Sequence, residues 1–215
     1  MYKHERRASL PKKPQVANRA PFPAPARQLT GLLDTYLKER RLSPKVADCN
    51  AWYVSQAAGD YLPRIVIPAS SLVEGHNYWQ ARAMHPDATI RYQSPLVARL
   101  DAIIAVYPVF TAQRRAATVL CEGPMDALAA AELGYMSIAL MGNNPASCVF
   151  DHIHTIIREN PIIVVGDKDA ASAWTQVAKA LWLRGMLVLR RVVCVMEKDL
   201  AAMTIEQRTQ TIQGG

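Results

Sequence analysis

The sequence has no long uninterrupted apolar run, no closely spaced pair of cysteines and no apolar segment near its N-terminus. A membrane-spanning helix needs about 20 consecutive apolar residues, and the opening stretch MYKHERRASLPKKP is charged where a signal peptide carries its apolar region. The four cysteines show neither CxxC nor CxxH spacing, so we expect buried, reduced thiols rather than disulfides or zinc ligands. These absences predict a soluble, cytoplasmic protein with no membrane segment and no zinc ribbon.

The positive charge of the chain is concentrated at one end. The net charge is +7, and residues 1–27 contain seven Lys or Arg residues against the single acid Glu5, which leaves only +1 for the rest. The same segment holds five prolines and little apolar periodicity, so it predicts a disordered basic arm. Such an arm, with Lys12 and Lys13, can bind phosphate backbones through counterion release, or it can act as a solubilising linker. The composition leaves both open.

The next segment, residues 28–116, predicts a smaller lobe of mixed α+β structure beside the main core. The leucines of RQLTGLLDTYLKERRLSP (28–45) recur at helical spacing, and Ser43 can cap a second short helix. RIVIPASS (64–71) and HNYWQARAM (76–84) are strand candidates on either side of a turn at Gly75. We therefore expect a hairpin in this lobe.

From residue 117 to residue 200 strands and helices alternate. The strand candidates are TVLC (118–121), SIAL (137–140), IIVV (162–165) and MLVLRRVVCV (186–195), with helices in each interval. These strands are near-continuous aliphatic runs, which predicts an α/β fold with a parallel sheet flanked by helices. Trp174 and Trp182, eight positions apart, are expected to pack against this sheet. Residues 201–215 are expected to form a polar, frayed tail.

Acidic residues follow the strands of this half. Glu122 comes directly after the first strand, Asp167 and Asp169 come after the third, and Asp199 comes shortly after the fourth. Taken singly, Asp169 can cap the helix that follows it, and Asp126 can stabilise the first turn of its own helix. Because the carboxyl ends of parallel strands meet at one edge, the acids are instead expected to converge. Carboxylates without nearby Cys or His favour Mg²⁺ or Mn²⁺.

These residues resemble a known family. VLCEGPMDALAAAELG and VVGDKDAASAW resemble the EGxxD and DxD motifs of the TOPRIM domain in DNA primases of the bacterial DnaG type and their phage relatives, over residues 117–200. EKDLAAM resembles the final acidic motif of that domain. Upstream, the likeness is looser: YLKERRLSP, RIVIPASSLVEGHNYWQARAM and IRYQSP resemble segments of the lobe that precedes it. The resemblance implies a TOPRIM-like parallel sheet flanked by helices, preceded by a mixed α+β lobe.

The implied activity is that of a nucleotidyltransferase, a DNA primase that makes short RNA primers from NTPs on single-stranded DNA during replication. By resemblance, the metal site for Mg²⁺ or Mn²⁺ comprises Glu122, Asp167, Asp169 and Asp199, the first three of which are also the catalytic candidates. Glu122 can bind a metal or accept the proton of the attacking 3′-hydroxyl. The implied nucleotide- or template-binding residues are Arg82, Arg91, Tyr92 and Lys168, together with Lys12 and Lys13 of the arm.

The sequence also departs from the family pattern. Lys168 and Ser172 stand where the family has glycine; Lys168 can neutralise charge or contact phosphate, or it can mark a weakened site. The chain contains no GxxxxGK[ST] phosphate loop. We therefore expect a phage-like variant, nucleoid-associated, with the replicative helicase and any zinc-binding module on separate chains. Two alternatives remain: a TOPRIM nuclease that hydrolyses phosphodiesters, and a non-catalytic nucleic-acid-binding accessory protein of replication.

Overall fold

The structure is a computed structural model of the 215-residue chain. It describes residues 21–56, 62–71, 78–95, 102–108, 115–142, 144–157, 159–194, 197 and 199–214. None of the helices in these ranges has the length and apolar content that crossing a bilayer requires. The basic residues Lys12 and Lys13, expected to contact nucleic acid, lie outside the described residues.

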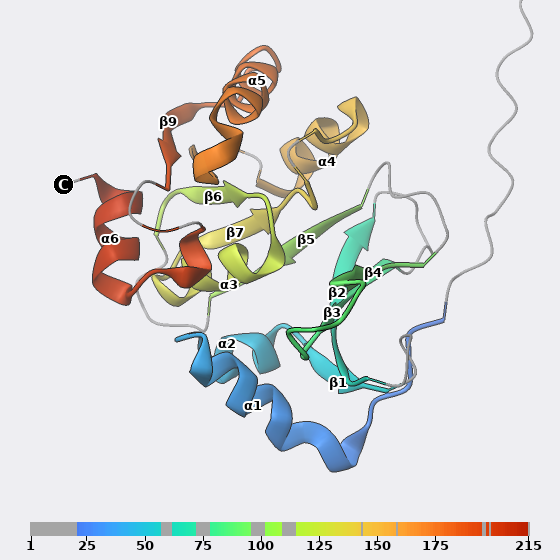
Figure 1. Cartoon of the computed structure of the whole chain (residues 1–215). Helices are drawn as coiled ribbons and strands as arrows, with labels where there is room; N and C mark the ends of the chain where they lie inside the picture. The colour runs from blue at the N-terminus through green and yellow to red at the C-terminus, as the bar shows by residue number, and fades with distance from the viewer. Residues whose placement is uncertain are drawn as a thin grey trace, which may run out of the picture.

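In the part of the chain that the structure describes, nine strands form one mixed sheet (Figure 1). The strands are β1 (Tyr53–Ser55), β2 (Arg64–Ser71), β3 (Tyr78–Ala83), β4 (Tyr92–Gln93), β5 (Ala102–Val106), β6 (Thr118–Cys121), β7 (Met136–Ala139), β8 (Ile162–Gly166) and β9 (Val188–Val193). Their order is β4-β3-β2-β5-β7-β6-β8-β9, with β1 paired to β2. The sheet therefore runs unbroken from the N-terminal lobe into the C-terminal half.

The C-terminal half of the sheet is parallel, as the sequence predicts. Strand β6 pairs in parallel with both β7 and β8, and β8 pairs in parallel with β9. The residues of β6 and β8 are all buried, which explains why neither strand contains a charged residue and why Val, Ile and Leu predominate. The α/β fold class predicted from the alternation of strands and helices is confirmed.

The N-terminal part of the sheet is antiparallel. The expected hairpin is formed by β2 and β3, with Ile65 opposite Arg82 and Ile67 opposite Gln80. Strand β5, which the sequence analysis did not identify, pairs antiparallel with β2 on one side and with β7 on the other. Because β5 joins the two parts, the N-terminal strands hold a defined position relative to the parallel strands.

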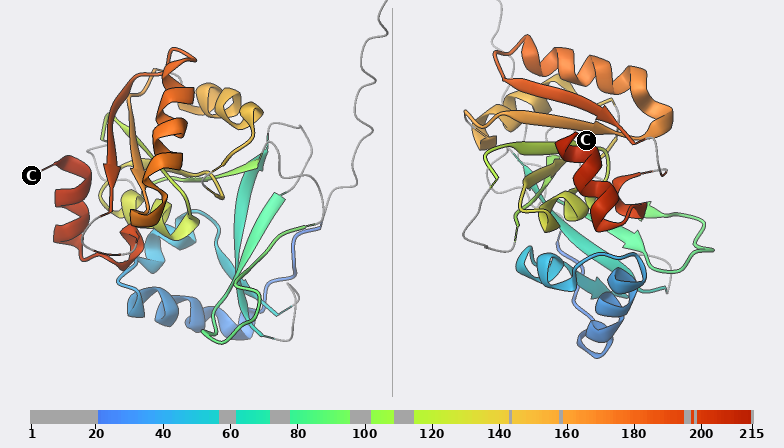
Figure 2. Two further views of the ribbon diagram at one scale, coloured as in Figure 1. Left: turned by 45° about the horizontal axis from the view of Figure 1, so that its top comes forward. Right: turned by 90° about the vertical axis from the view of Figure 1, so that its left-hand side faces the viewer.

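Helices cover both faces of the parallel part of the sheet (Figures 1 and 2). The α-helices are α1 (Thr30–Glu39), α2 (Pro44–Cys49), α3 (Pro124–Glu132), α4 (Ser147–Ile157), α5 (Ala171–Trp182) and α6 (Ile205–Gln213), and the 3₁₀ turns are η1 (Arg27–Leu29), η2 (Lys168–Ala170) and η3 (Leu200–Ala202). Val119 and Cys121 face the core under α1, α2, α3 and α6, whereas Leu120 faces the core under α4 and α5. Because successive side chains of β6 point to opposite faces of the sheet, this strand contributes to two hydrophobic cores.

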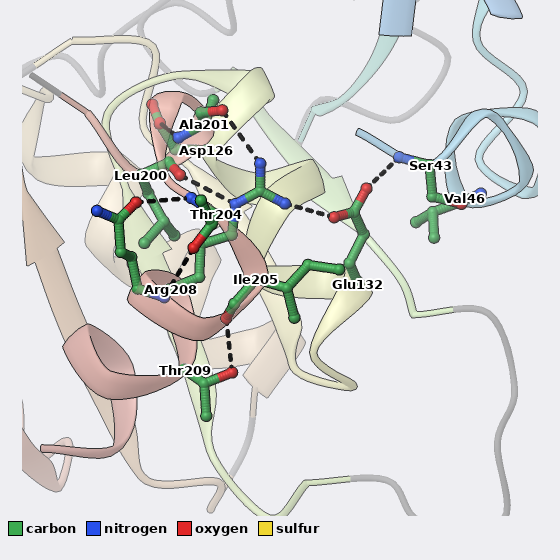
Figure 3. Close-up of polar contacts among 11 residues, drawn as sticks. Ser43, Val46, Asp126, Glu132, Leu200, Ala201, Thr204, Ile205, Arg208 and Thr209 are labelled. Atoms are coloured by element: carbon green, nitrogen blue, oxygen red, sulfur yellow. Dashed lines mark hydrogen bonds and ion pairs between the residues drawn. The ribbon is translucent and has the colours of Figure 1, made fainter. Parts of the chain in front are cut away.

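The expectation of a frayed C-terminal tail is wrong, because residues 205–213 form helix α6. A capping box between Thr204 and Gln207 starts the helix. Arg208, fully buried, donates to the Glu132 carboxylate on α3 at 2.6 Å and also to two backbone carbonyls of η3 (Figure 3). Glu132 in turn accepts a hydrogen bond from the backbone N–H of Ser43. The ion pair therefore links α6 to α3, and the hydrogen bond from Ser43 links α3 to the start of α2.

Residues 21–26, part of the segment expected to be a disordered arm, are held against the N-terminal lobe. The backbone N–H of Ala26 donates to the Val54 carbonyl at 2.8 Å. The side chains of Tyr53 and Trp79 donate to backbone carbonyls of the same segment, at 2.8 and 3.1 Å. These bonds fasten the segment along β1 and β3.

Two expectations about buried side chains need correction. Trp174 on α5 is fully buried, but Trp182 on the same helix is 68% exposed. Eight helical positions leave an offset of about 80°, because each residue turns the helix by about 100°, so the two rings do not share a face. All four cysteines are free, but only Cys121 and Cys194 are buried.

Candidate functional site

A cavity of about 320 Å³ lies where the two halves of the sheet meet, at the carboxyl ends of β6 and β8. The C-terminal half contributes carboxylates and the N-terminal half contributes cations. The charged lining residues are Glu122, Asp126, Asp167, Asp199, Arg40, Arg82 and Arg91. Opposite charges from distant parts of the chain therefore line one cavity.

The acids reach the cavity through the ends of the parallel strands. Glu122 directly follows β6, and Asp126 lies in the first turn of α3, which begins three residues after that strand ends. Asp167 directly follows β8, and Asp199 precedes η3 after β9. Three strand ends thus deliver four carboxylates to one edge of the sheet.

The position of Asp167 depends on a close approach between β8 and α5. A Cβ atom at Gly166 would lie 2.3 Å from Cδ1 of Trp174, a distance that no side chain tolerates. Only glycine lets the fully buried Trp174 ring pack against the end of β8. The chain leaves the strand at this point, so the glycine and the tryptophan together determine where Asp167 lies.

Asp126 is the most buried acid of the cavity. Its side chain accepts a hydrogen bond of 2.9 Å from the backbone N–H of Ala201 in η3 (Figure 3). Burial, together with the charges of Asp199 and Asp167, raises the pKa of Asp126 to about 7 against the effect of that hydrogen bond. Arg82 lowers the same pKa. The attraction of one arginine thus does not offset burial and the neighbouring carboxylates.

The pKa values of other groups at this edge are raised as well. Burial, followed by the charge of Asp169, raises the pKa of Glu122. Burial raises the pKa of the Cys194 thiol to about 12, with the nearby carboxylates adding to the effect. Burial also raises the pKa of the Cys121 thiol. Negative charge is therefore in excess at this edge, an environment that attracts a cation.

The oxygen-only donor set suits Mg²⁺ or Mn²⁺ better than zinc. Across the described ranges, no three His, Cys, Asp or Glu side chains are grouped closely enough to hold a metal ion between them. Magnesium does not require such a group, because it is usually bound by one or two carboxylates together with water and substrate phosphates. Asp167, Asp199 and Glu122 fit that mode of binding.

The three arginines of the cavity differ in how far they are exposed to solvent and in how many protein groups they contact. Arg82 is only 7% exposed; its Nε donates to the Tyr36 hydroxyl at 2.8 Å, and its Nη1 donates to the Tyr92 hydroxyl. Its guanidinium also lies 5.0 Å from the centroid of the Tyr92 ring. Arg40 lies 4.9 Å from the centroid of the Tyr36 ring, and both Arg40 and Arg91 are exposed. The two tyrosines thus hold the Arg82 guanidinium in place at the cavity wall, whereas the exposed Arg40 and Arg91 side chains can reach a ligand.

The structure separates the predicted site residues into two groups. Those that line the cavity are Glu122, Asp167, Asp199, Arg82, Arg91 and Tyr92. Asp169 and Lys168 lie on η2, are exposed and do not line it. Asp169 is still close enough for its charge to raise the pKa of Glu122.

Helix capping accounts for one of the acids. Asp199 accepts a hydrogen bond of 2.9 Å from the backbone of η3. In the described η2 and α5, neither Asp167 nor Asp169 makes a side-chain capping bond. Asp126 bonds to η3 rather than to its own helix. Capping therefore does not explain why Asp167, Asp169 and Asp126 are acidic.

Sequence reasoning missed two polar side chains that line the cavity, those of Arg40 and Gln80. Arg40 belongs to the segment YLKERRLSP, and the next residue, Arg41, has φ of 57° in the left-handed region. Gln80 lies on β3 between Tyr78 and Arg82, whose side chains share its face. A polar residue at a core-facing strand position was the available signal.

No protein-family model and no curated protein matches the chain. Solved structures do. The Aquifex aeolicus primase with its zinc-binding and RNA polymerase domains matches with a TM-score of 0.60 and 15% identity over 84% of this chain and 55% of that chain. The primase fragment of the bacteriophage T7 primase-helicase protein has a TM-score of 0.55 and 17% identity over 82% and 72%. A DnaG primase catalytic domain bound to single-stranded DNA has a TM-score of 0.56 and 17% identity over 82% and 73%.

At these identities the likeness shows the fold. The chain has the α/β fold of primase catalytic cores, and it spans about half the length of the Aquifex aeolicus chain that it matches.

Proposed function

We propose that the protein is a DNA primase that uses a divalent metal ion to synthesise short RNA primers from NTPs on single-stranded DNA. The observation that carries the proposal is the cavity in which carboxylates from three strand ends meet arginines of the N-terminal lobe. Nucleotidyl transfer needs both, because metal-binding carboxylates and phosphate-binding cations must act on one triphosphate. The fold of primase catalytic cores supports this assignment.

Asp167 and Asp199 are the proposed metal ligands, with Glu122 beside them. A bound Mg²⁺ or Mn²⁺ would offset the negative charge that develops on the phosphates during an in-line displacement. The raised pKa of Glu122 makes it a better proton acceptor for a 3′-hydroxyl near neutral pH than an ordinary carboxylate. Asp126, held by its hydrogen bond to η3, is proposed to orient this edge of the site.

The arginines of the cavity are proposed to have different roles. Arg40 and Arg91 are exposed and are proposed to bind the triphosphate or the template backbone. Arg82 donates from Nε and Nη1 to the hydroxyl groups of Tyr36 and Tyr92, so it is proposed to position these two tyrosines. Its other N–H groups are proposed to bind the nucleotide, since Arg82 lines the cavity.

The proposed partners are a single-stranded DNA template, NTPs, a replicative helicase and a separate zinc-binding module. One structural neighbour is a catalytic domain bound to single-stranded DNA, and another comes from a primase-helicase protein. In this chain, the basic N-terminal segment with Lys12 and Lys13 is proposed to assist template binding through counterion release.

The test is primer synthesis by the full chain on single-stranded DNA with labelled NTPs and Mg²⁺ or Mn²⁺. Wild type is compared with Asp167→Asn and with Asp34→Asn, in which an exposed acid on α1 serves as the matched control. We expect short RNA products from wild type and the control. Loss of the Asp167 carboxylate should lower the rate by about 100-fold or more, the scale seen when one group that stabilises transition-state charge is removed.

Two other results would replace the proposal. Cleavage of the DNA without RNA product would assign the same residues to phosphodiester hydrolysis. Binding of DNA with neither product nor cleavage, even after a helicase and a zinc-binding module are supplied, would assign the protein to an accessory role in replication.

A further inference from the structure

Gln80 is a buried polar residue with an unmet hydrogen-bonding requirement. It lies on β3 and is 6% exposed. Within the described residues, its side-chain oxygen Oε1 is buried and has no hydrogen-bond partner. Two positions along the same strand, Arg82 is similarly buried but donates to two tyrosine hydroxyls. The contrast shows that this face of β3 can satisfy a polar side chain, yet leaves the Gln80 oxygen unpaired.

An unpaired buried acceptor costs free energy, because the water that it gave up on folding is not replaced. The opposite residue on β2 is Ile67, and an apolar side chain of similar size would avoid that cost. Native structures keep few such groups, and a group at a ligand site is satisfied once the ligand supplies a donor. Gln80 lines the cavity that holds the carboxylates and arginines, so a ligand bound there can provide the missing donor.

The chemistry of the cavity indicates which part of a nucleotide Gln80 would contact. Arg40 and Arg91 are exposed cations and suit the phosphates. The carboxylates suit a metal ion bound to those phosphates. Gln80 is a neutral amide with an acceptor and a donor side by side, which matches the paired donor and acceptor on the edge of a nucleobase. A single sugar hydroxyl would engage only one of the two.

We propose that Gln80 is a specificity-determining residue whose amide hydrogen-bonds the edge of the nucleobase of a nucleotide held in this cavity. The proposal rests on the proposed function, since it takes the nucleotide to be the ligand. Adenine is the preferred base, because glutamine pairs with its N6 amino group and N7 through two hydrogen bonds.

The experiment measures binding of each of the four NTPs, and of dATP, to the full chain by calorimetry in the presence of Mg²⁺. Wild type is compared with Gln80→Leu, which keeps the approximate size and removes the amide. Gln210→Leu, an exposed position on α6, is the matched control. Thermal unfolding of each variant is recorded without nucleotide.

We expect Gln80→Leu to weaken ATP binding by roughly 5- to 150-fold, the range for one bidentate base contact, and to weaken binding of the other NTPs less. Because the variant removes an unpaired buried acceptor, its thermal midpoint should equal or exceed that of wild type. A merely structural role would lower the midpoint and leave base preference unchanged, which would overturn the proposal.

Each of the other possible outcomes would overturn the proposal. If wild type binds NTPs and Gln80→Leu binds all four as wild type does, or loses all four equally, base recognition by Gln80 is refuted while the proposed function stands. If the loss follows the 2′-hydroxyl, so that ATP is affected and dATP is not, the contact is with the sugar and the proposal fails. If wild type binds no NTP, the proposed function and this inference fall together.

Discussion

Asp126 should make the stability of the protein fall as pH rises from 4 to 7. Its carboxylate is 7% exposed and lies among other carboxylates, and its pKa is raised from 3.8 to about 7, first by burial and then by the charge of Asp199. The perturbation is Asp126→Asn, which removes the titrating proton. The amide oxygen can still accept the hydrogen bond that the backbone N–H of Ala201 donates to this position.

The sign follows from which state holds the proton more firmly. Between pH 4 and 7 the folded protein binds a proton at Asp126 and the unfolded chain does not, so raising the pH favours unfolding. The stabilising contribution is complete below about pH 4 and is lost as pH rises through 7. Because a tenfold difference in proton affinity between the two states corresponds to about 1.4 kcal/mol, the whole effect is at most about 4 kcal/mol.

Chemical unfolding is measured at a series of pH values between 4 and 8, without divalent ions, on wild type, Asp126→Asn and the exposed control Asp34→Asn. The free energy of unfolding of wild type, relative to Asp126→Asn, should fall by up to about 4 kcal/mol across this range and level off above pH 7. The control should follow wild type. If the difference in unfolding free energy between wild type and Asp126→Asn does not change with pH, Asp126 does not hold a proton in the folded protein.

Three further outcomes are expected. Gly166→Ala should lower the free energy of unfolding by about 1–3 kcal/mol, since its Cβ would lie 2.3 Å from the Trp174 ring; unchanged denaturant midpoints would contradict this packing. Arg208→Met should cost about 3–5 kcal/mol, because it leaves the Glu132 carboxylate buried without its partner, and adding Glu132→Gln should recover part of the loss in the same unfolding assay. Mg²⁺ should raise the thermal midpoint of wild type by mass action and raise that of Asp167→Asn less. Equal increases in the two proteins would show that Mg²⁺ binding does not depend on the Asp167 carboxylate.

Much of the parallel half of the fold could be predicted from local sequence. A strand buried on both faces is predominantly apolar and carries no charge, so TVLC and IIVV identify β6 and β8 directly. Glycine at 134 and 185 has positive φ where the preceding helices end. These signals lie within a few residues of the feature that they specify.

Helix α6 could not be predicted from local sequence signals. Its sequence is polar, and it is stabilised by the buried pair of Arg208 with Glu132, 76 residues away in the sequence. Strand β5 raised the same difficulty, since AIIAV is a strand because it fits between β2 and β7. Trp182 shows the opposite error: a shared face was expected from spacing alone, and the helix leaves its ring in solvent.

The carboxylates and their place after the strands could be read from the sequence, because chain connectivity puts these residues at strand ends. Which side chains face one another depends on tertiary contacts. Lys168 and Asp169 turn out of the cavity, Arg82 is engaged by two tyrosines, and Gln80 is left with an unpaired oxygen. These outcomes depend on contacts between the N-terminal lobe and the parallel strands, and no local pattern encodes the distance between segments that meet only after folding.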